Sequence, residues 1–289
     1  MVICVSGGLG NQMFQYAFGY AYAKDNDEEL IQDLFYASLN RNRKYGLDKY
    51  EVSYPKKSKI RGFVYHMGKK VFKKGIYLRR WKRINKVVVE TSSLDYQDVG
   101  TKNCYAIGTW INPRYFDKYR DEIIAQFKYK YPTDEDLEKL IKTIATSESL
   151  AIHIRRGDYL KPENQAYRNI EKSYYLKAID YMKKKTNVDG IYFFSDDIEW
   201  CKKEYEDVES AIFVDETISK SPYTDLELMR NCKYFVIANS TFSWWGAWLS
   251  TREGKQMVAP SKWFNGENNE IYNVRVRTML LKNFTILDE

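Results

Sequence analysis

Short apolar runs alternate with helical patterns through the second half of this 289-residue chain, and this alternation restricts the fold most strongly. The apolar runs are residues 150–154, 191–194, 211–214 and 234–238. Strands that alternate with helices form parallel sheets, because two parallel strands need a long crossover connection. The first half repeats the pattern less regularly, with strands expected at residues 2–5, 30–32 and 105–109. We therefore expect an α/β fold with a parallel sheet in each half.

A polar, acidic segment at residues 131–147 separates the two halves. It opens with Pro-Thr-Asp at residues 132–134, and we predict that it forms a helix leading into the second half. We place the domain boundary at its end, which gives an N-terminal domain of residues 1–147 and a C-terminal domain of residues 148–289. Both fall within the common size range of protein domains.

The sequence His-Ile-Arg-Arg-Gly-Asp-Tyr at residues 153–159 directly follows an apolar strand. A guanidinium group holds phosphate or carboxylate well, because its planar fork makes two parallel charge-assisted hydrogen bonds. In open α/β sheets, ligands also bind at the carboxyl ends of the strands. Arg155 and Arg156 are therefore candidate phosphate ligands. The alternative is an ordinary salt bridge within an exposed Arg-Arg-x-Asp turn.

Acidic residues follow the next strand of this half. Residues 191–194 run into Ser195, Asp196 and Asp197. Their carboxylates can accept hydrogen bonds from ribose hydroxyls or from an N–H group of a base. Aspartate at this place can also cap the helix that we expect from Ile198 onward. Both interpretations stay open.

Hydroxyl side chains follow the strand at residues 234–238. The sequence Asn-Ser-Thr-Phe-Ser-Trp-Trp-Gly at residues 239–246 opens a helix, whose N-terminal amides and dipole favour an anion. Ser240, Thr241 and Ser243 can supply further donors to the same phosphates. For the neighbouring pair, Trp244 and Trp245, we expect packing in the core. Together with the arginines, these groups predict a nucleoside diphosphate site at one edge of the sheet.

A glycine turn, Gly-Gly-Leu-Gly at residues 7–10, links the first strand to a helix that we expect from Asn11 onward. Asparagine is a common helix cap, so Asn11 can have a purely local role. Alternatively, the small residues Gly8 and Gly10 let a phosphate or sugar approach the helix N-terminus. The turn does not match the dinucleotide-binding pattern G-x-G-x-x-G.

Charge is distributed unevenly along the chain. Residues 41–86 contain seventeen Lys or Arg and two acids, a net charge of +15, which leaves −8 for the rest of a chain whose total is +7. Apolar residues at near-helical spacing lie within residues 61–86: Val64, Met67, Val71, Leu78 and Trp81. A basic amphipathic helix can lie on an anionic membrane surface. The same pattern also suits a solvated basic face, and both interpretations stay open.

Composition argues against several other classes. No apolar run approaches the roughly 18 residues of a membrane-spanning helix, and the apolar N-terminus is too short for a signal peptide. The four cysteines are widely spaced, which favours buried thiols in a cytosolic protein over disulfides or zinc ligands. Only two histidines are present, so a histidine-based metal site is not expected. We expect no nucleic-acid partner, because no known binding motif or aromatic stacking platform occurs.

Four motifs together resemble those of the α-1,2-fucosyltransferase family. Residues 7–17 (Gly-Gly-Leu-Gly-Asn-Gln-Met-Phe-Gln-Tyr-Ala) are similar to the N-terminal signature of that family. Residues 153–159 resemble its first GDP-fucose motif, and residues 194–197 and 239–245 are similar to the second and third. The order and spacing of the four motifs cover nearly the whole chain.

The resemblance implies a GT-B-like α/β architecture, with two Rossmann-like domains facing each other across a cleft. It also implies transfer of L-fucose from GDP-β-L-fucose to the 2-hydroxyl of a galactose-type residue on a glycan, with inversion and without a metal ion or other cofactor. The residues that it implies for GDP-fucose binding are Gly8, Gly10, Asn11, His153, Arg155, Arg156, Asp158, Ser195, Asp196, Asp197, Ser240, Thr241, Phe242 and Ser243.

Departure of GDP leaves negative charge that must be stabilised as the bond breaks. We expect Arg155 to do this with help from Asn11, and Asp158 to shape the donor pocket by orienting an arginine. The catalytic base stays open among Asp33, Asp158 and Glu163.

We expect a cytoplasmic enzyme whose partners are GDP-fucose and a galactose-containing glycan. Peripheral contact with the inner face of an anionic membrane through residues 41–86 is an additional hypothesis. Two other classes stay open: a transferase that uses another nucleotide sugar, and a noncatalytic protein that binds nucleotides or carbohydrates.

Overall fold

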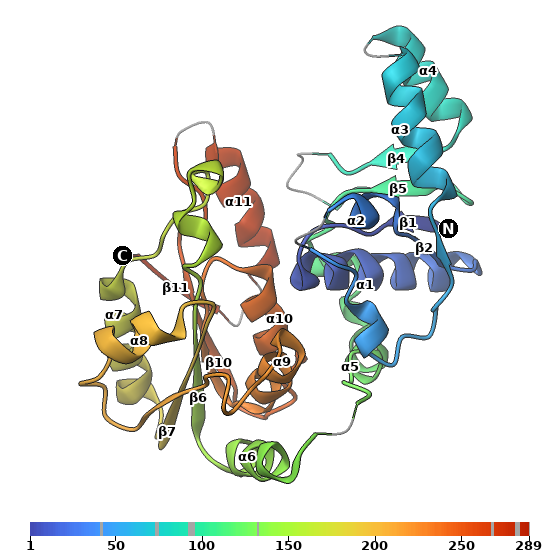
Figure 1. Cartoon of the computed structure of the whole chain (residues 1–289). Coiled ribbons are helices and arrows are strands. Elements are labelled where there is room, and N and C mark those ends of the chain that lie inside the picture. The colour runs from blue at the N-terminus through green and yellow to red at the C-terminus, as the bar shows by residue number, and fades with distance from the viewer. Residues whose placement is uncertain are drawn as a thin grey trace. The chain divides into compact units, whose positions relative to one another are not determined.

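Two compact units, Met1–Lys130 and Tyr131–Glu289, make up the computed structural model of the chain. The residues that it describes are 1–40, 43–72, 75–91, 96–131, 133–266, 269–280 and 284–288. Each unit contains a parallel sheet flanked by helices (Figure 1). The predicted GT-B-like α/β class, with a Rossmann-like arrangement in each half, is confirmed.

The division falls after Lys130, earlier than the predicted boundary at residue 147. The predicted acidic helix exists as α6 (Glu135–Thr146), but it lies in the second unit, where it packs against α9 (Pro222–Asn231). The guanidinium of Arg252 donates to three carbonyl oxygens at the C-terminal end of α6. Carbonyls at a helix end lack intrahelical partners, so these bonds attach α6 to the second unit. They come from a residue more than a hundred positions away, which periodicity cannot reveal.

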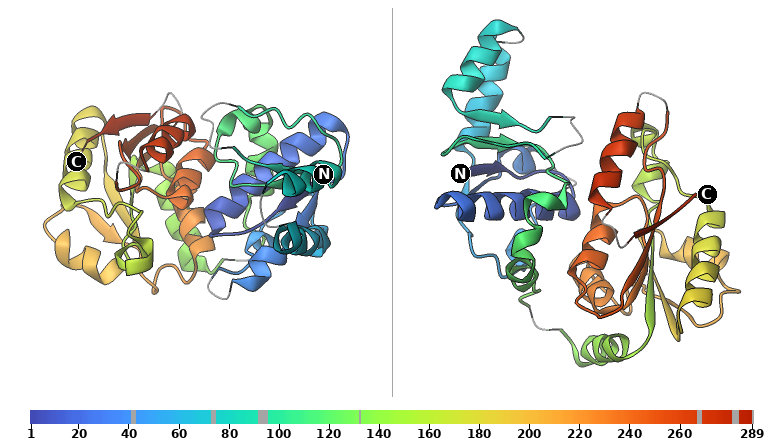
Figure 2. Two further views of the ribbon diagram at one scale, coloured as in Figure 1. Left: turned by 90° about the horizontal axis from the view of Figure 1, so that it is seen from above. Right: turned by 180° about the vertical axis from the view of Figure 1, so that it is seen from behind.

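The first unit is built on a five-stranded parallel sheet in the order β3-β2-β1-β5-β4. The strands are β1 (Val2–Cys4), β2 (Ile31–Asp33), β3 (Lys57–Ser58), β4 (Val87–Val89) and β5 (Tyr105–Ile107). The helices are α1 (Leu9–Asn26), α2 (Phe35–Leu39), α3 (Ile60–Phe72), α4 (Ile76–Ile84) and α5 (Arg120–Gln126), with 3₁₀ turns at Leu47–Lys49, Pro113–Tyr115 and Asp117–Tyr119. Helix α1 covers one face of this sheet, and α3 and α4 project from the other (Figures 1 and 2).

Helix α1 is the central helix of the first unit and is buried along most of its length. Phe18 on this helix stacks on Trp110, with ring centroids 3.9 Å apart. Gly19 allows close packing against the residue before β2, since a Cβ there would come within 2.8 Å of Leu30 Cδ1. This packing holds the middle of α1 in the core of the first unit.

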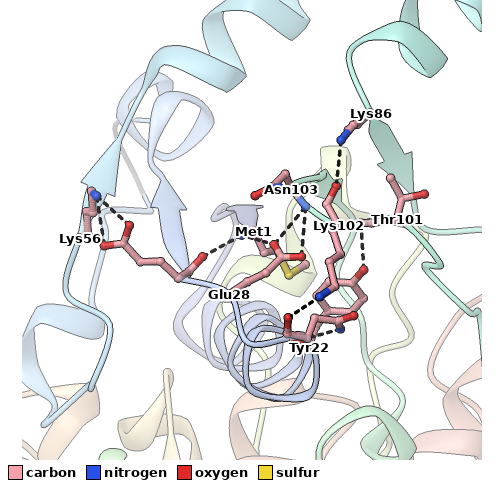
Figure 3. A network of polar contacts seen from close by, with 10 residues as sticks. Met1, Tyr22, Glu28, Lys56, Lys86, Thr101, Lys102 and Asn103 are labelled. Carbon is pink, nitrogen blue, oxygen red and sulfur yellow. Dashed lines mark hydrogen bonds and ion pairs between the residues drawn. The ribbon is translucent and has the colours of Figure 1, made fainter.

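An ionic network closes the amino edge of the same sheet (Figure 3). The N-terminal ammonium of Met1 donates to Glu28 Oε2 at 2.7 Å and to the carbonyl oxygen of Glu29 at 2.7 Å. The Glu28 carboxylate also accepts from the backbone N–H of Asn103, with both oxygens at 3.1 Å. The network therefore ties the segment after α1 to the start of β1 and to the loop before β5.

The second unit contains a six-stranded parallel sheet in the order β11-β10-β9-β6-β7-β8. The strands are β6 (Ser149–Ile154), β7 (Gly190–Ser195), β8 (Ala211–Phe213), β9 (Tyr234–Val236), β10 (Gln256–Pro260) and β11 (Phe284–Leu287). Besides α6 and α9, the helices are α7 (Lys172–Lys185), α8 (Ile198–Glu204), α10 (Thr241–Leu249) and α11 (Glu270–Met279), and 3₁₀ turns occur at Asp158–Leu160 and Pro162–Asn164. The centre of the sheet is β9-β6-β7, the strands that precede the three predicted polar clusters.

Helix α10 is almost wholly buried and packs through tryptophans, as expected for Trp244 and Trp245. Trp244 and Trp248 stack at 6.0 Å between ring centroids, and the indole N–H of Trp244 donates to the carbonyl oxygen of Met279 at 2.8 Å. Buried indoles need such a partner for their polar N–H. The packing therefore holds the start of α10 firmly at the end of β9.

Within the described ranges, none of the helices combines the length and the apolar character that a bilayer span requires.

Candidate functional site

The three polar clusters of the second unit follow three adjacent strands. Strands β6 and β7 pair in parallel with His153 opposite Phe194 and Ile154 opposite Ser195. The residues that follow each strand therefore begin side by side at the carboxyl edge of the sheet. Strand β9 pairs with β6 on its other side, so the start of α10 lies at the same edge.

Arg155 is held between two carboxylates, one from its own turn and one from the end of β7. Its Nη2 lies 2.6 Å from Asp158 Oδ1, and its Nη1 lies 3.0 Å from Asp196 Oδ2. The Arg155 side chain is 29% exposed, so it is oriented by these contacts and still reaches solvent. Asp158 thus orients an arginine, as predicted.

Arg156 is oriented by different partners. Its Nε donates to Asp197 Oδ2 at 3.1 Å, and its guanidinium carbon lies 4.2 Å from the centroid of the Trp200 ring. The backbone N–H of Arg156 donates to Asp196 Oδ1 at 2.9 Å. Because the bond to Asp197 uses Nε, both terminal nitrogens of Arg156 can donate to a ligand.

The contacts of Asp196 and Asp197 argue against the capping interpretation of these acids. Asp197 stands at the N-cap position of α8, but its side chain makes no capping hydrogen bond. Both carboxylates instead bind the arginine turn. Gly157 leaves room for this, since a Cβ there would lie 2.8 Å from Asp196 Oδ2. The two acids therefore position arginines, and their predicted contacts with ribose or base stay a prediction.

His153 lies beneath this edge at the end of β6. It is buried, and its ring centroid is 5.5 Å from that of Phe242 on α10. Burial, with the positive charge of Arg155 adding to it, lowers the pKa of His153 to about 3. The imidazole is therefore neutral at physiological pH. This fits a role in shaping the site better than one in neutralising phosphate charge.

The start of α10 contributes amides and one partly exposed hydroxyl-bearing residue. Ser240 is the N-cap, and its Oγ accepts from the N–H of Phe242 at 3.3 Å. Ser243 is buried and its hydroxyl donates to the Ser240 carbonyl oxygen at 3.1 Å, which favours helix packing over the predicted phosphate contact. Thr241 and Phe242 are partly exposed. Tyr159 joins the loop before this helix to the arginine turn, because its hydroxyl donates to the Asn239 carbonyl oxygen at 3.0 Å.

In the first unit, the glycine turn follows β1 at the carboxyl edge of its sheet. Gly7 has a φ of +81°, which glycine adopts without strain. Helix α1 begins at Leu9 with Gly8 as its N-cap, so the interpretation of Asn11 as the cap was wrong. Asn11 lies in the first turn of the helix and is partly exposed, while Gly10 is buried. The backbone amides of this turn are placed where an anion or sugar could approach them.

Two buried glutamines of the same motif hold the glycine turn in place. Gln12 donates to the carbonyl oxygens of Gly7 and Lys44 at 2.9 Å each, and its Oε1 accepts from the N–H of Gly46 at 2.9 Å. Gln15 Oε1 accepts from the N–H of Ser6 at 2.9 Å. These amides satisfy loop backbone that would otherwise be buried without partners. Both glutamines belong to the N-terminal motif at residues 7–17, but nothing in the sequence indicates this role.

A pocket of about 410 Å³ lies at the same edge of the first sheet. It is lined by Leu34, Ala37, Ser38, Asn40, Lys44, Tyr45 and Lys59. Leu34 follows the carboxyl end of β2 and Lys59 follows that of β3. Open α/β sheets bind ligands at this edge, so the pocket is a candidate subsite.

The three candidate bases have different environments. Asp33 is fully buried, and its two carboxylate oxygens accept from the N–H groups of Phe35 at 3.1 Å and Gly62 at 3.0 Å. Burial raises its pKa. Asp158 is paired with Arg155, whereas Glu163 is exposed on a 3₁₀ turn. The contacts of Asp33 fit a structural role, because they connect β2 with the starts of α2 and α3.

Two contacts near this edge of the second sheet were not predicted from the sequence. Trp200, on the first turn of α8, stacks on Arg156. Asn239 donates from its side-chain amide to the carbonyl oxygens of Arg168 and Trp263 at 2.7 and 2.9 Å, and so braces the loop before α10. The only available signal for Trp200 was its position one helical turn after two acidic residues. Within the described part of the chain, no three or more His, Cys, Asp and Glu side chains converge as metal ligands.

Residues 1–276 match the family model described as Glycosyl transferase family 11. The chain belongs to this family. The match covers the arginine turn, the acidic cluster and the start of α10 together with the glycine turn. The predicted membership is thereby confirmed.

Two Escherichia coli proteins are similar to this family-11 protein over almost its whole length. One is named alpha-1,2-colitosyltransferase and is 31% identical over 281 residues, covering 92% of this chain and 93% of the relative. The other is named O-antigen biosynthesis glycosyltransferase WbnK and is 29% identical over 301 residues, covering 93% and 96%. Among solved structures, the fucosyltransferase NodZ from Bradyrhizobium aligns with a TM-score of 0.51 at 10% identity, over 85% of this chain and 91% of NodZ. This last similarity concerns the fold.

Proposed function

We propose that this family-11 glycosyltransferase transfers L-fucose from GDP-β-L-fucose to the 2-hydroxyl of a galactose-type residue on a glycan, with inversion and without a metal ion. The observation that carries the proposal is the pair Arg155 and Arg156 at the end of β6, oriented by three carboxylates beside the start of α10. Oriented guanidinium groups next to a helix N-terminus suit a diphosphate.

The chemistry requires charge stabilisation at the leaving group. The oxygen of the acceptor 2-hydroxyl attacks the anomeric carbon of fucose as the bond from that carbon to the β-phosphate oxygen breaks. GDP leaves with the bonding electron pair, and the hydroxyl proton passes to a base. Arg155 would stabilise the charge that develops on the β-phosphate, because its fork is already oriented by Asp158 and Asp196.

Other residues take roles that follow from their contacts. Arg156 would bind the other phosphate through its two terminal nitrogens, and Thr241 with the amides of α10 would donate to the same group. His153 and Phe242 would form the wall of the donor pocket. Asn11 remains our proposed helper of Arg155, and the base remains Asp158 or Glu163, because Asp33 is buried and bound to backbone.

The acceptor would use the first unit. The pocket beside Leu34 and Lys59 is at the edge of the sheet where ligands bind. The relatives named for colitosyl transfer and for O-antigen biosynthesis support a bacterial surface glycan as the acceptor class. The four cysteines are buried and unpaired, which fits our proposal that the enzyme acts in the reducing cytoplasm.

A second donor deserves a direct test, because a relative with 31% identity is named as a colitosyltransferase. The name specifies the same 1,2-linkage as our proposal but a different transferred sugar. Competition between the guanosine diphosphate esters of L-fucose and colitose for one acceptor would show which donor has the higher kcat/KM.

The first experiment is turnover of purified protein with GDP-fucose and lactose in excess EDTA, with the product identified by NMR. A fucosyl-α-1,2-galactose product would support the donor, the linkage, inversion and metal independence together. Turnover that needs a restored divalent cation would contradict metal independence alone. Slow release of fucose from GDP-fucose without transfer to lactose would support the donor and contradict this acceptor. Absence of GDP-fucose binding by calorimetry would overturn the proposal.

A further inference from the structure

The pair of helices α3 and α4 carries an apolar surface that the fold does not use. Nine large apolar side chains on these helices are at least 36% exposed: Ile60, Phe63, Val64, Met67, Val71, Phe72, Ile76, Tyr77 and Ile84. Nineteen such side chains occur among all described residues, so nearly half of them lie on two of the helices. Scattered exposed apolar residues are normal, but a concentrated group marks an interaction surface.

On α3 this group forms one stripe. Residues 60, 63, 64, 67 and 71 recur at helical spacing, and they point away from the face formed by Gly62, Tyr65 and Gly68, which is buried. An amphipathic helix of a globular domain normally turns its apolar stripe toward the core. Here the stripe predicted from the sequence at Val64, Met67 and Val71 is the exposed one.

The inner face of α3 explains why the outer stripe is free. Gly68 packs directly against Trp81 of α4, since a Cβ there would lie 2.4 Å from the ring carbon Cζ2. Tyr65 packs with Cys4 and Tyr105 of the sheet. The small residues and the aromatic rings therefore complete the packing of the two helices on the first unit. Figures 1 and 2 show the pair projecting from the sheet.

Basic side chains are concentrated on the same two helices and beside them. Residues 52–89 contain no aspartate or glutamate and thirteen Lys or Arg. Seven of these cations are exposed and lie on the two helices or next to their ends: Lys59, Lys69, Lys70, Arg79, Arg80, Arg83 and Lys86. None of the seven makes an ion pair with a described carboxylate. The positive charge of this region is thus available for an anionic surface.

We infer that the α3–α4 pair docks on an anionic lipid surface, with its aliphatic side chains entering the headgroup region and its cations binding lipid phosphates. Charge complementarity and exposed Ile and Val side chains favour a bilayer over nucleic acid, which would offer these side chains no apolar partner. Lys59 both precedes α3 and lines the pocket proposed for the acceptor. Docking would therefore present that pocket to glycans attached to a membrane lipid.

Vesicle flotation of the full chain tests the inference. Vesicles of phosphatidylcholine alone are compared with vesicles that also contain phosphatidylglycerol, at low and high salt. We expect binding to the anionic vesicles, weakened at least tenfold by high salt, and little binding to the neutral ones. Absence of binding, or equal binding to both compositions, overturns the inference.

Matched variants distinguish binding through this surface from nonspecific binding of vesicles by other exposed side chains. Ile60→Ser, Val71→Ser and Ile76→Ser in one chain should reduce anionic vesicle binding at least tenfold, and Arg79→Glu with Arg80→Glu should do the same. The controls are Leu176→Ser with Ile212→Ser for the exposed apolar side chains and Lys183→Glu with Lys184→Glu for the exposed cations, all outside this region. Unchanged far-ultraviolet circular dichroism and melting temperature verify that each variant folds. Equal losses in test and control variants contradict the inference.

A cysteine label reports insertion directly. All four native cysteines are buried, so Ile76→Cys, at a position that is 74% exposed, offers a selectively reactive thiol. A polarity-sensitive dye at this position should shift its emission to the blue with anionic vesicles, whereas the same dye at Leu176→Cys should not. Light scattering tests whether a second copy of the chain covers this surface instead. If the wild type is a dimer, the α3–α4 variants are monomers and the dye shows no blue shift on vesicles, the surface is a dimer interface and the inference is wrong. None of these measurements depends on turnover, so they are independent of the proposed function.

Discussion

The guanidinium of Arg156 lies over the indole of Trp200, 4.2 Å from its ring centroid, while Nε of the same guanidinium binds Asp197. Stacking and the ion pair together restrict the orientation of the guanidinium group, and the ion pair through Nε leaves both terminal nitrogens able to donate to a ligand. Trp200 is therefore a positioning residue for a proposed phosphate ligand. It is only partly buried, so its substitution can be tolerated by the fold.

Replacement of Trp200 should weaken donor binding without changing the chemical step. Loss of a cation–π contact corresponds to roughly 0.5–2 kcal/mol, or about a 2- to 30-fold rise in the KM for GDP-fucose. Trp200→Leu should show this rise with kcat nearly unchanged, and Trp200→Phe should recover most of the affinity. Steady-state kinetics with varied donor concentration provides the measurement. Equal KM values for the Leu and Phe variants would mean that stacking does not position Arg156.

Arg155→Lys should nearly abolish transfer. Arg155 meets Asp158 and Asp196 with separate terminal nitrogens, and an ammonium group cannot reproduce this fork. We expect kcat to fall on the order of 10²–10⁴-fold, the cost of losing a group that stabilises the leaving charge. The matched control is Arg277→Lys on the exposed side of α11, which should keep wild-type turnover. Near wild-type activity of Arg155→Lys would remove its proposed role.

Asp33→Asn should affect stability more than catalysis. The carboxylate accepts from two backbone amides at the starts of α2 and α3, and an Asn side chain can offer only one accepting oxygen there. We expect the free energy of unfolding to fall by about 1–3 kcal/mol, with kcat retained by the folded protein. Urea unfolding and turnover measured on the same sample test both parts.

Glu163→Gln is the comparison for Asp33→Asn, since Glu163 is exposed whereas Asp33 is buried. Unchanged stability with a loss of kcat and of the acidic limb of the pH–rate profile would identify Glu163 as the base. A large loss of kcat in folded Asp33→Asn would instead return Asp33 to that role.

The central strands could be predicted from the sequence, because strands buried on both faces appear as unbroken apolar runs. Strands β6 and β7 are examples, and the polar clusters at their ends were found with them. The edge strands β3, β4 and β11 were missed, and so was the interior strand β10 (Gln256–Pro260). Strand β3 consists of Lys57 and Ser58 alone, and its polar residues resemble a loop. Strand β4 follows the basic helices so closely that Val87–Val89 could be taken for their continuation.

The site was predictable as a set of residues but not as a set of contacts. The ion pair between Arg155 and Asp196 joins residues 41 positions apart, and it depends on the register of β6 against β7. Apolar runs do not determine that register. Likewise, the stripe of Val64 and Met67 was visible as a helical pattern, but its exposure depends on the packing of Gly68 against Trp81. Periodicity shows that a helix has two faces, whereas tertiary packing decides which one is buried.

His153 should make the protein less stable below neutral pH, because burial and Arg155 lower its pKa to about 3 in the folded state, against about 6.5 in an unfolded chain. Between these pKa values only the unfolded chain binds the proton. The stability of the fold with a neutral, buried His153 is therefore fully present above pH 6.5 and decreases as the pH falls toward 3. The free energy of unfolding of the wild type should decrease by about 2 kcal/mol more than that of His153→Gln between pH 7 and pH 5. Urea unfolding at both pH values measures this difference, and using the variant as reference removes the contribution of all other titrating groups. Parallel pH dependences in the two proteins would show that His153 takes up a proton in the folded state, which would contradict a neutral imidazole at the end of β6.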